Sequence, residues 1–138
     1  MPRPCYVIKN LHDDKNQVVG RWRGLVYWDI NSVFRWLKKR QVKLDIETVS
    51  KAKSLIPISI LRNVDVELAY RGRGFGDMAM EEFIAWSQKK KCVYSMLEAD
   101  ADRMQRKGFD LVKWYEKWGF AVVGTCYSGE HCIMIREL

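Results

Sequence analysis

Residues 64–77, with the sequence VDVELAYRGRGFGD, decide how the rest of the chain is interpreted. The stretch begins with alternating apolar and acidic residues, and this period of two predicts a β-strand with two unlike faces. Gly72, Gly74 and Gly76 follow, and such a turn lets the backbone bend tightly and approach a ligand closely. A helical pattern comes next, so the turn opens a helix whose amides and positive dipole end favour an anion. Strand, turn and helix together predict a site for a phosphate or pyrophosphate group.

The charge of this turn and the spacing of its glycines restrict the class of ligand that it is expected to bind. Arg71 and Arg73 add positive charge beside the glycines. The spacing G-x-G-x-G differs from the G-x-G-x-x-G of dinucleotide folds, and no G-K-[ST] follows as in nucleoside triphosphate P-loops. A purely structural turn stays open as an alternative, because a glycine-rich turn taken alone is weak evidence.

The periodicities along the chain predict an α/β (α+β) architecture of one domain over residues 1–138. Predicted strands cover residues 5–9, 18–22, 58–69, 92–99, 120–125 and 132–137, the first two forming a hairpin around a turn at 13–16. Predicted helices cover residues 31–40, residues 46–54, the stretch from the glycine turn to Lys89, and residues 109–118. Asn31 or Ser32 is the predicted N-cap of the first helix, and Gly119 is predicted to end the last one.

The composition limits which binding partners and which cellular location we expect. The 24 basic and 17 acidic residues give a formal charge of +7, which favours anionic partners such as nucleic acid or a phosphorylated cofactor. No apolar run approaches the ~20 residues that span a bilayer. The first residues lack the apolar core of a secretory signal, so we expect a cytoplasmic protein without a membrane partner.

The cysteines give no sign of a metal centre. No two of the four cysteines form a C-x-x-C pair. Cys126, His131 and Cys132 are residue types that bind zinc, but their spacing matches no common zinc pattern. The sequence therefore predicts no metal site and buried or unreactive thiols.

Two segments resemble motifs of the GNAT superfamily of N-acetyltransferases. Residues 64–76 resemble its acetyl-coenzyme A signature, a strand ending in a [QR]-x-x-G-x-[GA] turn, here Arg71, Gly74 and Gly76. Residues 111–120, LVKWYEKWGF, resemble its later motif, a helix that ends in Tyr-Glu-Lys-x-Gly-Phe. The two motifs lie in the expected order, with one helix and one strand between them. The resemblance covers residues 58 to 124, about half of the chain, and leaves the first 57 residues unmatched.

The resemblance implies a fold and a co-substrate. The implied fold is a mixed, mostly antiparallel sheet flanked by helices, whose central strands splay apart to admit the pantetheine arm of acetyl-coenzyme A. The edge of the strand at residues 64–66 would hydrogen-bond this arm, and the amides of residues 72–77 would hold the pyrophosphate. The implied cofactor-binding residues are Val64, Asp65, Val66, Arg71, Gly72, Arg73, Gly74, Phe75, Gly76 and Asp77.

The resemblance also implies catalytic residues. Tyr115 falls where many members have a tyrosine that protonates the departing thiolate, and Glu98 falls where some members place a general base. Glu67, Asp65 or a water molecule are alternatives for the base, because geometry decides this role. The sequence departs from the pattern at Leu68, where a proline is common, and in a longer connection at residues 100–108 that lacks a usual asparagine.

The implied activity is transfer of an acetyl group from acetyl-coenzyme A to a primary amine by direct attack. The acceptor stays open among a small amine, a protein amine and an aminoacyl group on RNA. One alternative is a catalytically inactive acyl-coenzyme A-binding module. Another is a nucleic-acid-binding protein that uses Lys38, Lys39, Arg40, Lys51 and Lys53. The sequence also leaves open whether the chain forms a homodimer.

Overall fold

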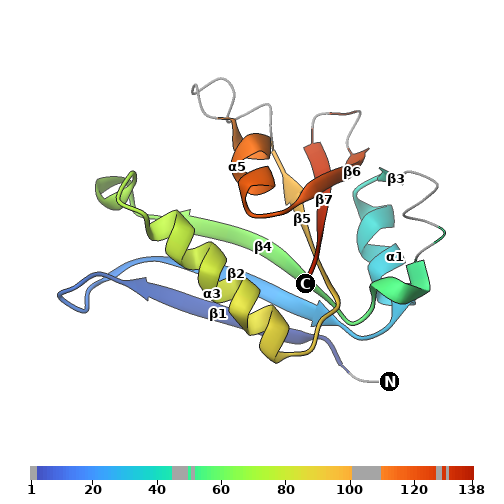
Figure 1. The fold of residues 1–138 in the computed structure, drawn as a ribbon, viewed down its shortest axis with the longest axis horizontal. Helices are drawn as coiled ribbons and strands as arrows, with labels where there is room; N and C mark the ends of the chain where they lie inside the picture. The colour runs from blue at the N-terminus through green and yellow to red at the C-terminus, as the bar shows by residue number, and fades with distance from the viewer. Residues whose placement is uncertain (1–2, 45–49, 51, 101–109, 127–128, 130) are drawn as a thin grey trace.

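A computed structural model describes residues 3–44, 50, 52–100, 110–126, 129 and 131–138. Within these ranges a seven-stranded sheet has the strand order β1-β2-β4-β5-β7-β6-β3 (Figure 1). Its strands are β1 (Cys5–His12), β2 (Val18–Tyr27), β3 (Lys43–Leu44), β4 (Ile58–Val66), β5 (Tyr94–Ala99), β6 (Ala121–Cys126) and β7 (His131–Glu137). Neighbouring strands are antiparallel, except that β4 and β5 are parallel. The predicted mixed and mostly antiparallel sheet is confirmed.

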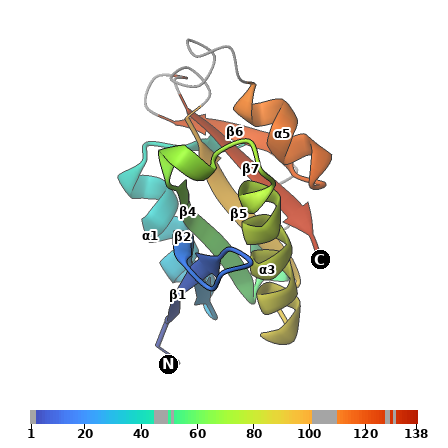
Figure 2. The same ribbon diagram turned by 90° about the vertical axis from the view of Figure 1, so that its left-hand side faces the viewer.

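Helices cover both faces of this sheet (Figure 2). They are α1 (Ile30–Lys39), α3 (Phe75–Lys89), α5 (Leu111–Lys117) and the 3-10 turns η1 (Ala52–Leu55) and η2 (Leu68–Tyr70). Helices α3 and α5 pack on one face, around Trp22, Phe83 and Met134. Helix α1 packs on the other face, around Met96 and Ile133. No helix in the described ranges is long and apolar enough to cross a membrane.

The N-cap of α1 was predicted wrongly. The helix begins at Ile30, and Asp29 caps it by accepting from the Ser32 amide at 3.0 Å and from the Ser32 hydroxyl at 2.7 Å. An N-cap side chain accepts a hydrogen bond from the backbone amide two or three positions later in the chain. Ser32 lies three positions after Asp29, so Asp29 fits this rule. Neither Asn31 nor Ser32 is the cap, because both already lie inside the helix. The prediction that Gly119 ends α5 is confirmed, since Gly119 has φ +90° directly after the helix.

Other predicted boundaries shift. The strand predicted to reach residue 69 ends at Val66, because the chain turns into η2, where the Tyr70 amide bonds the Glu67 carbonyl at 2.9 Å. The strand predicted from residue 92 starts at Tyr94, because the Cys92 amide still bonds the Ser87 carbonyl of the preceding helix. The helix predicted over residues 46–54 lies mostly outside the described residues, and its end is η1. Strand β3 was not predicted, since two residues carry no periodicity.

A β-bulge opens the centre of the sheet. Strands β4 and β5 pair only from Ile58 with Tyr94 to Leu61 with Leu97. In the β2–β4 ladder, Gly24 lies opposite Leu61 and Arg23 lies opposite Asn63, so Arg62 is an extra residue in β4. A bulge bends its strand and raises the local twist. Beyond it β4 turns away from β5, as Figure 1 shows, so the predicted splay of the central strands is confirmed.

Candidate active site

The glycine turn leaves open space in front of the start of α3. Gly72 has φ +78° and Gly74 has φ +86°, and a β-carbon at either position would meet no atom within 4 Å. Their role is therefore conformational, since side chains rarely adopt these angles. Gly76 differs, because a β-carbon there would lie 3.4 Å from the Trp114 ring of α5. Gly72 and Gly74 shape the turn, and Gly76 lies where α3 faces the Trp114 ring of α5.

Helix α3 begins without a side-chain cap, in contrast to α1 and α5. Asp29 caps α1, and Asp110 caps α5 by accepting from the Lys113 amide at 3.0 Å. Gly74 is the N-cap of α3 and offers no side chain. The first amides of a helix have no partner inside the helix. No side chain therefore caps the start of α3, and Asp77 is the acidic side chain of this first turn.

The two arginines of the turn make contacts within the protein. Arg71 donates from Nε to the Val66 carbonyl at 3.0 Å, which ties the turn to the end of β4. The guanidinium of Arg73 lies 5.4 Å from the centre of the Tyr70 ring, a cation–π distance. A guanidinium has five N–H donors, so these contacts leave donors for an anion.

The splayed part of β4 presents backbone groups toward β5. The Glu67 amide bonds the Val19 carbonyl at 2.8 Å on the β2 side. Alternation along an antiparallel strand then turns the N–H and C=O groups of Val66 and Val64 to the opposite edge, toward the splay. The side chains of both valines pack against the core beneath α3, whereas that of Asp65 is exposed. The backbone groups of Val64 and Val66 therefore face the splay, where the Val66 carbonyl also accepts from Arg71.

Tyr115 lies on α5 in a nearly closed environment. Its side chain is 8% exposed and packs edge-on against Phe120, with ring centres 6.2 Å apart. Burial raises the pKa of the Tyr115 phenol to about 12. The phenol is therefore neutral at physiological pH and can act as a hydrogen-bond donor.

Glu98 is held by partners from two other elements. It lies one residue beyond the end of the β4–β5 ladder, on the face covered by α1. The Arg40 Nε lies 2.9 Å from one carboxylate oxygen, and the His131 Nδ1 lies 2.8 Å from the other. The Cys126 thiol donates to that second oxygen at 3.7 Å. Sequence reasoning assigned Arg40 to nucleic acid and His131 to a rejected zinc site, and missed both as partners of Glu98. The register that pairs β7 with β5 and β6 could have brought His131 near Glu98, but only once the strands were ordered.

The cluster around Glu98 also has the geometry of a metal-ligand set. One ligand atom each from Glu98, Cys126 and His131 lie within 4.8 Å of one another. Burial, together with the nearby Glu98 charge, raises the pKa of the Cys126 thiol to about 12. The Cys126 thiol donates to Glu98 and His131 contacts the same oxygen, so the three side chains form one hydrogen-bonded cluster. Cys132, the third residue of the rejected zinc idea, does not belong to this set in the described part of the chain, and burial raises its pKa.

The remaining candidates lie apart from Glu98. Asp65 and Glu67, the alternative bases, are exposed at the far end of β4 beyond the bulge. Lys38 and Lys39 are exposed in the last turn of α1. Lys51, the side chain of Lys53 and the connection at residues 101–108 lie outside the described residues.

Comparison with known proteins identifies the fold of this chain. No protein-family model matches the chain, and no curated protein matches its sequence. Solved structures do match. An acetyltransferase from Bacillus cereus aligns with TM-score 0.64 and 14% identity, over 98% of this chain and 74% of its own. The PaiA N-acetyltransferase of Thermoplasma acidophilum, in complex with coenzyme A, aligns with TM-score 0.59 and 16% identity, over 97% and 62%. A GNAT family acetyltransferase from Elizabethkingia anophelis, with acetyl-coenzyme A bound, aligns with TM-score 0.54 and 12% identity, over 91% and 72%.

These alignments span nearly the whole chain, so the likeness extends to the first 57 residues, for which the sequence showed no resemblance. At identities of 12 to 16%, the likeness is one of fold. The chain has the fold of the GNAT N-acetyltransferases.

Proposed function

We propose that this chain is an acetyl-coenzyme A-dependent N-acetyltransferase that acts on a primary amine. The observation that carries the proposal is the combination of two features. The bulge at Arg62 opens the sheet between β4 and β5, and the uncapped N-terminus of α3 lies after the splayed end of β4. An extended arm that ends in a pyrophosphate needs both features at once. Structures with this fold have been solved with coenzyme A or acetyl-coenzyme A, which supports the choice of co-substrate.

In this proposal the backbone does most of the donor binding. The edge at Val64 and Val66 hydrogen-bonds the amides of the pantetheine arm, as an added strand would, while Asp65 between them turns its backbone groups toward β2. The amides of residues 72–77 bind the pyrophosphate at the positive end of α3, and Arg71 and Arg73 add charge.

Tyr115 and Glu98 carry the chemistry in this proposal. The nitrogen of the acceptor amine attacks the thioester carbonyl carbon, a C–N bond forms and the C–S bond breaks. Glu98, directly or through a water molecule, takes the proton that the amine loses. Tyr115 donates a hydrogen bond to the departing sulfur. Because the pKa of Tyr115 is about 12, the phenol stays protonated until the negative charge develops on sulfur. The sulfur leaves as a thiolate and takes a proton from solvent, while Glu98 releases to solvent the proton that the amine lost. The products are the N-acetylated amine and the free thiol.

The partners of Glu98 fix the orientation of its carboxylate. Arg40 contacts one oxygen, and His131 and Cys126 both contact the other. The oxygen that Arg40 contacts keeps a second lone pair that can accept a proton. Asp65 and Glu67 are weaker candidates, because they lie beyond the bulge and are exposed to solvent.

Thermal unfolding in the presence of acetyl-coenzyme A tests the donor site. A ligand at a hundredfold excess over its Kd stabilises the folded state by about 2.7 kcal/mol. Absence of any stabilisation would contradict the proposal. Release of free thiol with a panel of primary amines then tests transfer and separates an enzyme from an inactive acyl-coenzyme A-binding module.

Tyr115→Phe in the same assays tests the catalytic role of the phenol. We expect turnover to fall by roughly a hundredfold or more while the stabilisation by acetyl-coenzyme A persists. Tyr94→Phe is the matched control, because Tyr94 lies at the opposite, paired end of β5 and should keep full turnover. Equal turnover of the two variants would remove Tyr115 from the mechanism.

A further inference from the structure

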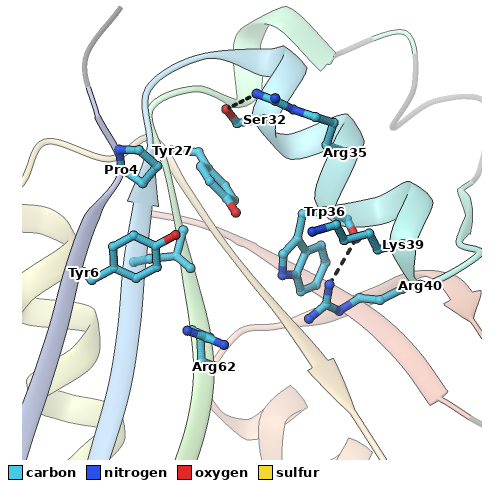
Figure 3. A pocket seen from close by; sticks show the side chains of 10 residues that line it. Pro4, Tyr6, Tyr27, Ser32, Arg35, Trp36, Lys39, Arg40 and Arg62 are labelled. Atoms are coloured by element: carbon cyan, nitrogen blue, oxygen red, sulfur yellow. Dashed lines mark hydrogen bonds between the residues drawn. The ribbon is translucent and has the colours of Figure 1, made fainter.

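A pocket of about 480 Å³ lies on the α1 face of the sheet, and the reaction proposed above leaves most of its residues unused. It is formed between α1 on one side and the strands β1, β2 and β4 on the other (Figure 3). We call it the α1 pocket. Its volume lies in the range of small-molecule sites, about 300–1,000 Å³.

The charged side chains of the α1 pocket are all positive. Arg35, Lys39, Arg40 and Arg62 line it, and no acidic residue does. Arg40 is paired with Glu98, and Arg35 lies near the Asp29 carboxylate through Ser32. Lys39 and Arg62 have no ion-pair partner within the described residues. Like charges repel one another, so an anion in the pocket would stabilise this arrangement.

The electrostatics at Tyr27 show that these cations converge. Burial raises the pKa of the Tyr27 phenol, and Arg40, Arg62 and Arg35 act on it in the opposite direction. One phenol thus lies in the field of three guanidinium groups from α1 and β4.

Aromatic rings form the rest of the wall. Tyr6 and Tyr27 extend from β1 and β2 toward α1, and Trp36 lies across from them (Figure 3). Tyr6 is 60% exposed although it is large and apolar, so its ring is available for contact. The Arg40 guanidinium already stacks on Trp36 at 3.9 Å. Flat rings beside guanidinium groups suit a planar ligand that carries negative charge.

The α1 pocket adjoins the proposed reaction centre through two of its lining residues. Arg40 lines the pocket and donates to Glu98, so a single side chain contacts both. Arg62 lines the pocket and is the bulge residue at which β4 and β5 begin to splay. A molecule bound in the α1 pocket would therefore lie against the side chain that orients Glu98.

We propose that the α1 pocket binds the acceptor, and that the acceptor is a primary amine bearing a planar ring and a phosphate group. This inference rests on the proposed acetyltransferase function. Phosphate is the fitting anion because guanidinium groups bind it with paired hydrogen bonds, and a lysine adds a further charge. The same chemistry has two sources, a free phosphorylated amine and the terminal nucleotide of an RNA that carries an amine.

Matched acceptors test the substrate class. We would measure kcat/KM for pyridoxamine 5′-phosphate against pyridoxamine, and for O-phosphotyramine against tyramine. In each pair the amine and the ring are the same and only the phosphate differs. We expect the phosphorylated member to be at least about tenfold better, as a charged hydrogen bond provides. No preference for the phosphorylated member in either pair, absence of turnover included, would overturn the inference.

A second arm identifies the source of the phosphate. Two acceptors would be compared, AMP and an RNA decamer, each with an aminohexyl group on its 5′-phosphate. Turnover of each would be measured at low and at moderate salt. Equal turnover supports a free phosphorylated amine, because one nucleotide then fills the site. A preference for the decamer that falls steeply with salt supports an RNA end.

Substitutions test the place of binding. Lys39→Gln and Arg62→Gln each remove one charge from the wall, and both side chains are exposed enough to spare the fold. We expect each variant to lower the phosphorylated-to-unphosphorylated ratio of kcat/KM by about tenfold. Lys38→Gln is the matched control, because Lys38 belongs to the same last turn of α1 and does not line the pocket. Lys38→Gln should keep the phosphorylated-to-unphosphorylated ratio of kcat/KM that the unmodified chain shows.

The outcomes separate this inference from the proposed function. If acetyl-coenzyme A stabilises the protein and amines are acetylated, but Lys39→Gln and Arg62→Gln keep the ratio of the unmodified chain, only the α1 pocket assignment is wrong. If acetyl-coenzyme A neither stabilises the protein nor reacts, both proposals fail.

Discussion

Gly74→Ala is the substitution that tests the anion site most directly. Gly74 is the N-cap of α3 and has φ +86°. An alanine at such an angle costs roughly 1–2 kcal/mol of folding free energy. No atom lies within 4 Å of the added β-carbon, so no clash adds to this cost. The unliganded variant should therefore melt about 4–8 °C lower, taking roughly 4 °C per kcal/mol for a chain of this length.

The effect of the substitution on acetyl-coenzyme A binding is separate from this loss of folding stability. The added methyl group would occupy the open space in which a pyrophosphate approaches the amides of α3. If Kd rises tenfold, acetyl-coenzyme A at a hundredfold excess over the original Kd stabilises by about 1.4 instead of about 2.7 kcal/mol. The ligand-induced rise in melting temperature, measured by differential scanning fluorimetry, would fall from roughly 11 °C to roughly 6 °C.

Gly129→Ala is the control for the backbone cost. Gly129 has φ +90°, a β-carbon there also meets nothing within 4 Å, and the residue lies between β6 and β7. Both variants should lose similar stability without ligand, and only Gly74→Ala should lose the response to acetyl-coenzyme A. A full response in Gly74→Ala would refute the view that the glycine turn binds the phosphates.

Three further predictions concern the rest of the site. The pKa of the Tyr115 phenol, about 12, lies above its ordinary value of 10.0, so its contribution to stability is complete below pH 10 and is lost as pH rises toward 12. At pH 11 the free energy of unfolding is lower by about 1.4 kcal/mol for this reason. Urea unfolding at pH 9 and pH 11 should show that Tyr115→Phe lacks this part of the decrease in unfolding free energy. Glu98→Gln should reduce kcat by roughly a hundredfold or more without changing the stabilisation by acetyl-coenzyme A, and an unchanged kcat would assign the base to another group. Asp110→Ala removes the cap of α5 and should cost about 1 kcal/mol in urea unfolding, while Asp110→Asn should retain most of the stability.

Local signals allowed much of this fold to be predicted. The alternation before Arg71, the glycines after it and the Tyr-Glu-Lys-x-Gly-Phe pattern at Tyr115 each lie within a dozen residues. They therefore specify strand, turn and helix without knowledge of distant contacts. The N-cap Asp29 was missed by two to three positions, because several polar residues that can cap a helix follow one another there.

Long-range features could not be predicted in this way. The extra residue at Arg62 becomes visible only when β4 is aligned against β2, because a bulge is a property of a strand pair. Glu98 meets Arg40 across 58 positions and His131 across 33, so no window of sequence contains these contacts. The α1 pocket likewise combines residues from the first strand to β4, and its charge was visible only as a net excess of basic residues.

The short ladder between β4 and β5 has a consequence for how the protein unfolds. Within the described residues, the backbone ladder between the two halves of the sheet has four residue pairs, and a buried hydrogen bond joins Ser59 to Ser95 at 2.9 Å. The two hydrophobic clusters also cross this seam, so side-chain packing and not backbone pairing holds most of the two halves together. We expect the backbone at the splayed ends of β4 and β5 to open at a lower free energy than the paired ends. A ligand that bonds to both sides of the splay would join the splayed ends. Amide hydrogen exchange should therefore be faster at the splayed ends than at the paired ends in the unliganded protein, and the two rates should converge when acetyl-coenzyme A is bound.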